Sequence, residues 1–394
     1  MLPPWLDRAQ WAALLGTALA FSAGYATVGL VVILLVVLVE GIVTRRLPWR
    51  RTSGDIYLAS FLVAFLISGW ASSYRPFAIG SAGVAAVTLF VGLGPLYRQL
   101  LQNPARLAPF VSAWVTGGLA ATLWAGYLSL RTGDNASTPA LGQNALGTTL
   151  LVALVLSLGL LLTSLPAWRY LVAGGCALLT LGIALTASRG AWLGTVVGVL
   201  TFLWLAKVHR GWLVAVLLVL LGMIGFVLIN PERSYLVSRA RGIGVPVQNQ
   251  ARIAVAKSAG AIFADHPILG TGLNTFSFVH PQYKFPNDPD STQPFAPNVF
   301  LNMAAEGGLL GLIAFAAILV WAGREGWRWC QAGGSRSESI MSAAILAAFL
   351  GLLTHQFLDG TMLSVHVGSG LWFLVAMLAA SSPHSGTMGA RADA

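Results

Sequence analysis

Apolar stretches of about 20 residues recur along most of the chain, and this length is what a helix needs to cross the hydrocarbon core of a bilayer. They run from Trp11 to Ala380. Charged residues make up only 9% of the 394 residues, whereas a soluble domain carries about a quarter. The sequence therefore predicts an all-α integral membrane protein.

Hydropathy predicts about twelve transmembrane helices, with the first pair the least distinct. The expected ranges are 9–23, 26–43, 55–71, 77–97, 108–129, 146–165, 168–186, 191–206, 211–229, 298–322, 340–357 and 363–380. Residues 1–229 then hold helices 1–9, residues 230–297 form one long extracytoplasmic loop with short helices, and residues 298–380 hold helices 10–12. We expect residues 381–394 to be a disordered cytoplasmic tail.

The net charge of +10 indicates how the chain is oriented in the membrane, and it does not indicate nucleic-acid binding. Most of the 23 basic residues fall in short connectors on one side of the predicted helices. Short loops with excess Lys and Arg stay in the cytoplasm, whereas long loops cross largely regardless of charge. The long loop therefore faces outward, and we expect no nucleic acid partner.

Arg189 is the one charged residue in the segment LGIALTASRGAWLGTVVGVL. A charge at membrane depth costs roughly 2.5 kcal/mol or more. An arginine at the end of a span commonly extends to water along its alkyl stem. Here the small neighbours Ser188 and Gly190 also allow a ligand to approach closely. A guanidinium grips a phosphate with two parallel hydrogen bonds, so Arg189 is a candidate phosphate ligand.

The long loop adds further cations, beginning with Arg239 and Arg241. A short amphipathic helix is expected over 251–263, flanked on either side of its apolar stripe by Arg252 and Lys257. Its apolar face is predicted from Ile253, Ala256 and Phe263. Arg252 and Lys257 are either substrate ligands or members of a solvated helix edge, and the sequence leaves both interpretations open.

The segment after this helix predicts a sharp turn. Pro267 disfavours helix at the residue before it, so Asp265-His266-Pro267 ends the helix. Gly270 and Gly272 then permit a tight turn, because glycine adopts positive φ at little cost. We expect both glycines to be structural.

The tenth span opens with PNVFLNMAAEGGLLGL. Asn298, Asn302 and Glu306 are spaced i, i+4, i+8 and so share one helical face. A carboxylate inside a membrane needs a partner or a water-filled cavity. Glu306 is expected to serve a neighbouring helix structurally, whereas Asn298 and Asn302, nearer the surface, are candidates to line a substrate cleft.

Three further groups are candidates for proton handling. His355 and Asp359 in THQFLDG are again four residues apart and are expected at the outer rim on one helical face. A His–Asp pair beside a basic loop is a candidate acid or base. His280 in the long loop is another imidazole with expected access to the outer surface.

These outer-face groups suit the diphosphate of a lipid-linked sugar. Negative charge builds on the departing diphosphate during glycosyl transfer, and fixed cations stabilise it. The segments TASRGAW, DHPILGTGLNTF and NVFLNMAAEGGLLGL resemble, in this order, signatures of the O-antigen ligase and polymerase superfamily. The resemblance covers about Thr186 to Gly360.

This resemblance implies a metal-independent, inverting glycosyltransferase without a cofactor. Such an enzyme lies in the bacterial cytoplasmic membrane and acts at its outer, periplasmic face. It moves glycan from an undecaprenyl diphosphate carrier to a glycan or lipid acceptor, which is lipid A-core for ligases. Membrane lipid is a further partner of such an enzyme. By motif, Arg189 and Arg252 correspond to the diphosphate-binding arginines and Asp359 to the late carboxylate.

One position departs from the family pattern. Family ligases carry a histidine, the proposed base, directly before the asparagine that opens the tenth span, and this chain has Pro297 there. His280, His355 or Asp359 are possible substitutes. The departure leaves open a polysaccharide polymerase using the same donor. A secondary transporter of an anion or lipid-linked intermediate is the alternative of another class, although no repeat of broken helices supports it.

Overall fold

The computed structural model describes residues 3–45, 49–207, 246–286, 288 and 293–380. This part of the chain holds thirteen α-helices and no strand, so the all-α prediction is confirmed. The helices of the bundle are α1 (Pro4–Phe21), α2 (Ala26–Thr44), α3 (Asp55–Ala71), α4 (Arg75–Gln102), α5 (Leu107–Thr132), α6 (Gln143–Thr163), α7 (Pro166–Leu185), α8 (Arg189–Leu205), α13 (Val299–Gln331), α14 (Arg336–Gln356) and α15 (Val365–Ala380). The remaining helices are α11 (Pro246–Asp265) and α12 (Phe276–Val279), with 3₁₀ turns η1 (Pro104–Arg106), η4 (His280–Tyr283) and η5 (Thr361–Leu363).

Eleven of the twelve predicted spans coincide with a helix, to within a few residues at most ends. Seven helices of the described part are long and apolar enough to cross a membrane, and α3, α8 and α15 are shorter apolar helices. The predicted span 211–229 lies outside the described residues. The protein is thus a multi-pass membrane protein, and the number twelve stays a prediction.

The helix ends follow local sequence signals. Proline stands in the first turn of α7, where its missing N–H costs nothing. Gly133 ends α5 in the left-handed conformation with φ +76°. Ser335 and Glu338 form a reciprocal capping box at the start of α14. These signals explain where the three helices begin or end.

Small residues bring α8 and α14 together. A Cβ on Gly194 of α8 would lie 2.6 Å from the carbonyl oxygen of Gly351 on α14. Such close backbone approach is how membrane helices gain packing energy without a hydrophobic driving force. The beginning of α8, with Arg189, is therefore held beside the end of α14.

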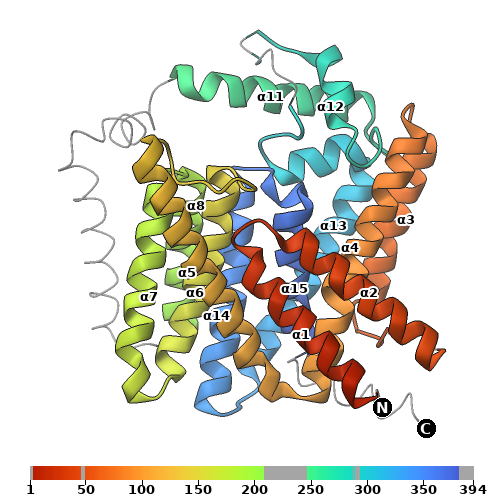
Figure 1. Cartoon of the computed structure of the whole chain (residues 1–394). Helices are drawn as coiled ribbons and strands as arrows, with labels where there is room; N and C mark the ends of the chain where they lie inside the picture. Colours follow the sequence, from red (N-terminus) through yellow and green to blue (C-terminus); the bar gives the residue numbers. More distant parts are fainter. Residues whose placement is uncertain (1–2, 46–48, 208–245, 287, 289–292, 381–394) are drawn as a thin grey trace.

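The described residues between α8 and α13 form a cap over one end of the bundle, with α11 lying across that end (Figure 1). Two parts of the sequence-based expectation hold: a helix is present, and it ends at Asp265. The apolar stripe predicted from Ile253, Ala256 and Phe263 was expected to lie on the membrane or on the bundle, and Ile253, which is 52% exposed, does not pack on the bundle. The buried residues are Ala254, Val255, Ser258, Ala259 and Ile262, which pack in part against Phe276 and Val279.

The loop after α11 inserts into a break in α13. Gly308 has φ +61° and ψ −161° inside this helix, so the tenth span is not the continuous helix that hydropathy predicts. The N–H groups of Leu309 and Leu310 bond instead to the carbonyls of Pro267 and Ile268, at 2.8 and 3.2 Å. The cap is thereby anchored to the bundle by backbone hydrogen bonds.

Candidate active site at the junction of cap and bundle

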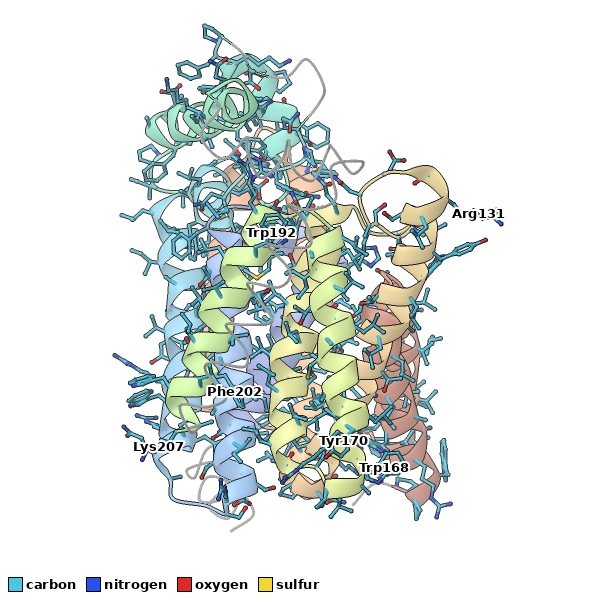
Figure 2. The ribbon with its side chains drawn as sticks, turned by 90° about the vertical axis from the view of Figure 1, so that its left-hand side faces the viewer. Arg131, Trp168, Tyr170, Trp192, Phe202 and Lys207 are labelled. Atoms are coloured by element: carbon cyan, nitrogen blue, oxygen red, sulfur yellow. The ribbon has the colours of Figure 1, made fainter. Side chains whose placement is uncertain are left out.

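A sharp turn places Arg189 at the first residue of α8. Ala187 has φ +52°, which reverses the chain between α7 and α8. Ser188 then caps α8, its hydroxyl accepting the N–H of Ala191 at 3.4 Å. Arg189 follows directly, at a helix N-terminus whose partial positive charge favours anions. Trp192, in the first turn of α8, lies at the cap end of the helix and Lys207 at the other end (Figure 2).

Arg252 approaches the same place from the cap. It donates to the carbonyl of Leu358 at 2.7 Å and to Asp359 Oδ2 at 3.5 Å. The Arg252 side chain is 44% exposed, whereas that of Asp359 is 8% exposed. Arg252 is thus a cation at the mouth of the site, with guanidinium surface still open to a ligand.

Asp359 is held by the bundle rather than by the arginine. Its Oδ2 accepts from Asn144 Nδ2 at 2.6 Å, and its Oδ1 accepts from the N–H of Thr361 at 2.9 Å. The predicted i, i+4 helical pairing with His355 is wrong, because α14 ends at Gln356 and Asp359 lies in the following turn. That turn aims the carboxylate at α6 and the cap.

Arg189, Arg252 and Asp359 line one small pocket, although they come from three distant parts of the chain. The rest of its lining is Asn144, Ala187, Ser188, Gly190 and Leu358. Its free volume of about 20 Å³ is that of roughly one water molecule. The lining contains two arginines and one aspartate, so the charged side chains that border the pocket sum to a net positive charge, which suits a phosphate.

His355 lies directly beneath this pocket and is fully buried. Gln356 Nε2 and Thr148 Oγ1 lie 2.9 and 3.0 Å from His355 Nδ1. The Ser188 hydroxyl lies 3.5 Å from His355 Nε2. A Cβ on Gly190 would lie 2.8 Å from this ring. His355 therefore supports the turn before α8 and does not itself line the pocket.

His280 lies elsewhere, inside the cap. Its side chain is fully buried, so its expected access to the outer surface is wrong. It stacks on Phe276 and bonds through Nε2 to Asp288 Oδ2 at 3.1 Å, and the same oxygen accepts from the Ser258 hydroxyl at 2.9 Å. Burial in the small apolar core of the cap, together with an acidic partner, explains its place.

Asn298, Asn302 and Glu306 hold the cap on α13. Asn298 caps the helix and donates to the carbonyl of Phe357 at 2.9 Å. Asn302 accepts the N–H of Ala296 at 2.8 Å, and Glu306 accepts the N–H groups of Asn274 and Phe276 at 2.9 and 3.0 Å. A buried carboxylate with two backbone donors fits the predicted structural role of Glu306.

Gly270 and Gly272 are positioned by the same contact. Both have positive φ, at +64° and +107°. A Cβ on Gly270 would lie 2.3 Å from the carbonyl carbon of Glu306, and one on Gly272 would lie 2.6 Å from Ala78. These distances support the structural role predicted for the two glycines.

Three further basic residues were predicted to bind substrate. Lys257 is exposed on α11 and is not part of the small pocket, and Arg239 and Arg241 lie outside the described residues. The substrate-binding roles given to Lys257, Arg239 and Arg241 stay predictions. Elsewhere in the cap, Tyr283 donates to Asp265 at 2.8 Å, and this hydrogen bond raises the pKa of the phenol.

A larger cavity of about 600 Å³ lies between α3, α4, α13 and α15, below the cap. Its lining is mainly apolar and includes Phe61, Val84 and Trp372, with Asn302 and Glu306 among its polar residues. A volume of this size suits a small molecule or a lipid chain.

The sequence-based search missed Asn144 and Thr361, which bind the Asp359 carboxylate. Asn144 carries a weak signal, since it is an amide near the cap-side end of a long apolar helix. The i, i+4 rule drew attention to the wrong partner, His355, because the helix ends before Asp359.

The fold and this pocket define a class, that of multi-pass membrane proteins with a charged site beneath a helical cap. Residues 174–316 match the family model described as O-antigen ligase. This segment is an O-antigen ligase domain, and the protein is accordingly an enzyme of the membrane glycosyltransferase type. The matched range contains Arg189 and Arg252, whereas Asp359 lies beyond it. No curated protein matches the chain.

Proposed function

We propose that this enzyme transfers a glycan from undecaprenyl diphosphate to a lipid A-core or similar acceptor. The transfer is metal-independent and inverts the anomeric carbon. The observation that carries the proposal is the meeting of Arg189, Arg252 and Asp359 in one positive pocket, within and beside a domain whose family acts on lipid-linked glycans.

Orientation and topology belong to the same proposal. With twelve spans, the predicted loop 230–297, to which the cap belongs, lies on the periplasmic side of the bacterial cytoplasmic membrane. The basic connectors then lie in the cytoplasm, as the positive-inside rule requires. The tail 381–394 is cytoplasmic, and the 600 Å³ cavity below the cap supports a substrate with a hydrocarbon chain.

The chemistry divides between the two arginines and the carboxylate. The acceptor hydroxyl attacks the anomeric carbon, the bond from that carbon to the diphosphate oxygen breaks, and the hydroxyl proton passes to Asp359. Arg189 and Arg252 stabilise the charge that grows on the diphosphate. Asp359 fits the role of base better than His280 or His355, because it is the one of the three that lines the pocket.

The pocket must widen to admit a diphosphate, since it now holds the volume of one water molecule. Arg252 is the group that moves, because its side chain is half-exposed and its longer contact, to Asp359, is weak at 3.5 Å. Arg189, at the start of a packed helix, stays in place. Donor binding therefore replaces the contact between Arg252 and the end of α14.

Transfer of radiolabelled glycan from undecaprenyl diphosphate tests this proposal, with the protein in nanodiscs and EDTA present. The double variant Arg189→Ala/Arg252→Ala is expected to lose activity by about 10²–10³-fold, the usual effect of removing groups that stabilise a developing charge. Arg131→Ala is the matched control, because Arg131 also lies at the cap end but on the outer surface (Figure 2). Normal transfer by the double variant contradicts the mechanism.

The length of the product separates two enzymes that share this donor. A ligase attaches the glycan to lipid A-core, whereas a polymerase extends the glycan on its own carrier. The replacement of the family histidine by Pro297 keeps the polymerase as the second candidate. A ladder of longer glycans on undecaprenyl diphosphate, made without added acceptor, identifies a polymerase.

A further inference from the structure

A second cavity, of about 480 Å³, lies along α3 and α13 toward the end of the bundle opposite the cap. Its α13 wall includes Ile313, Ala317, Val320 and Arg324, whose spacing places them on one face of the helix. From Ile313 to Arg324 this face is about 16 Å long at 1.5 Å per residue. That length is close to one leaflet of the hydrocarbon core, which is roughly 15 Å thick.

The cavity ends at two arginines. Arg324 is exposed, and Arg328 bonds to Glu325 at 2.9 Å. Glu325 is buried and also accepts from the Ser53 hydroxyl at 3.4 Å. The carboxylate therefore offsets one of the two cations. The polar end of the cavity is left with one net positive charge, next to an apolar groove.

Trp321 joins α13 to the start of α3 along this wall. The Trp321 indole donates to the Ser53 hydroxyl at 3.0 Å. It also lies on the backbone of Gly54, where a Cβ would come within 2.4 Å of the ring. The groove is thus a preformed feature of the contact between α3 and α13.

Aromatic residues place the arginine end near a membrane surface. Trp204 and Trp327 stack with their ring centroids 5.9 Å apart. Trp168 and Tyr170, both exposed, lie at the same end of the bundle as Lys207 (Figure 2). Such aromatic belts mark the level of lipid headgroups. The groove therefore runs from headgroup level into the hydrocarbon, and it faces a bilayer.

We propose that this groove binds an anionic phospholipid of the phosphatidylglycerol type. One acyl chain lies along Ile313, Ala317 and Val320, and the phosphate pairs with Arg324 and with the guanidinium N–H groups of Arg328 that Glu325 does not use. Basic pockets between membrane helices recognise anionic headgroups in this way. The site does not depend on the proposed glycan transfer, because its ligand is a bilayer component in the opposite leaflet from the cap.

Lipid retention in native mass spectrometry tests the proposal. The protein is released from nanodiscs of equal phosphatidylglycerol and phosphatidylcholine content. Wild type is expected to retain phosphatidylglycerol several-fold more than phosphatidylcholine, and Arg324→Gln is expected to lose that preference. Arg336→Gln, an exposed arginine at the same end of the bundle, is the matched control and keeps it. Ala317→Phe fills the groove and is expected to reduce retention of both lipids.

Two results overturn the site. One is equal retention of the two lipids by wild type, and the other is an Arg324→Gln variant that keeps the full preference. Arg324 is exposed, so its replacement leaves the packed helices intact, and circular dichroism confirms the fold of each variant. Retention unchanged in Ala317→Phe but lost in Arg324→Gln places the lipid on the surface outside the groove, which also contradicts the proposal.

Discussion

Two arginine–carboxylate pairs lie at opposite ends of the bundle, one buried and one half-exposed, and their burial indicates that the first is structural and the second can bind a ligand. Arg98 on α4 binds Glu40 on α2, with side chains 7% and 3% exposed. Its two terminal nitrogens bond to both carboxylate oxygens, and Nη2 also donates to Gln10 Oε1 at 2.8 Å. Arg252 and Asp359 form the other pair, 3.5 Å apart, with the arginine 44% exposed.

The two pairs differ in how far the guanidinium N–H groups are already hydrogen-bonded. The terminal nitrogens of the buried Arg98 bind a bidentate carboxylate and an amide, and its role is to hold α1, α2 and α4 together. Arg252 has one good bond, to a backbone carbonyl, and a weak contact with an acid that already has two other donors. A pair of an arginine and a carboxylate therefore holds helices together at one end of the bundle, and at the other end it leaves a guanidinium available to a ligand.

Stability provides the largest test of this comparison. Arg98→Ala strands the Glu40 carboxylate among helices and is expected to cost about 3–5 kcal/mol, as for other buried pairs that lose one partner. Arg252→Ala leaves Asp359 with Asn144 and Thr361 and is expected to cost less than about 1 kcal/mol. Thermal unfolding of both variants in the same detergent measures the difference. Equal losses would show that the two pairs do the same work.

Activity provides the next largest test. Asp359→Asn keeps the shape of the side chain but removes its charge and its ability to accept the hydroxyl proton. Transfer by the folded protein is expected to fall by about 100-fold, within the usual range for a general base and equal to about 2.7 kcal/mol. Glu40→Gln is the control, since Glu40 lies on α2, at the end of the bundle opposite the proposed active site.

A steady-state assay at matched amounts of folded protein separates the two effects. Glu40→Gln is expected to lower the melting temperature and leave kcat of the folded protein unchanged. Asp359→Asn is expected to lower kcat and leave the melting temperature unchanged. If Asp359→Asn retains full kcat, the proton goes elsewhere, and the assignment of Asp359 as base is refuted.

The sequence predicts the helices well because hydropathy alone fixes where the chain must be helical in lipid. It also predicts that Arg189, Arg252 and Asp359 lie at one end, since each falls at the cap-side end of a span or in the long loop. What it does not predict is side-chain geometry between distant segments. Asn144 meets Asp359 only because α6 lies against α14, and no spacing rule reports such a contact.

The cap is where prediction from sequence is poorest. Its helix buries mostly small residues together with Ile262 and exposes Ile253 at 52%, so the predicted apolar stripe is not the face that packs inside the cap. Periodicity weights large residues, whereas most of the buried residues of this helix are small. His280 is misplaced for a related reason, because its burial depends on Asp288 and Ser258, which no local pattern connects to it.

Substitution of Lys257 is expected to have the smallest effect, and it tests how far the donor site extends along α11 from the pocket of Arg189, Arg252 and Asp359. It lies five residues after Arg252 on α11, about 140° around the helix at 3.6 residues per turn, and it is absent from the pocket lining. Lys257→Ala is therefore expected to change kcat/KM by less than about threefold, through the general attraction of an exposed cation for an anionic donor, which salt screens. The transfer assay at low and high ionic strength measures this effect beside Arg252→Ala. A loss as large as that of Arg252→Ala, and insensitive to salt, would place the donor along α11 instead of between Arg189 and Asp359.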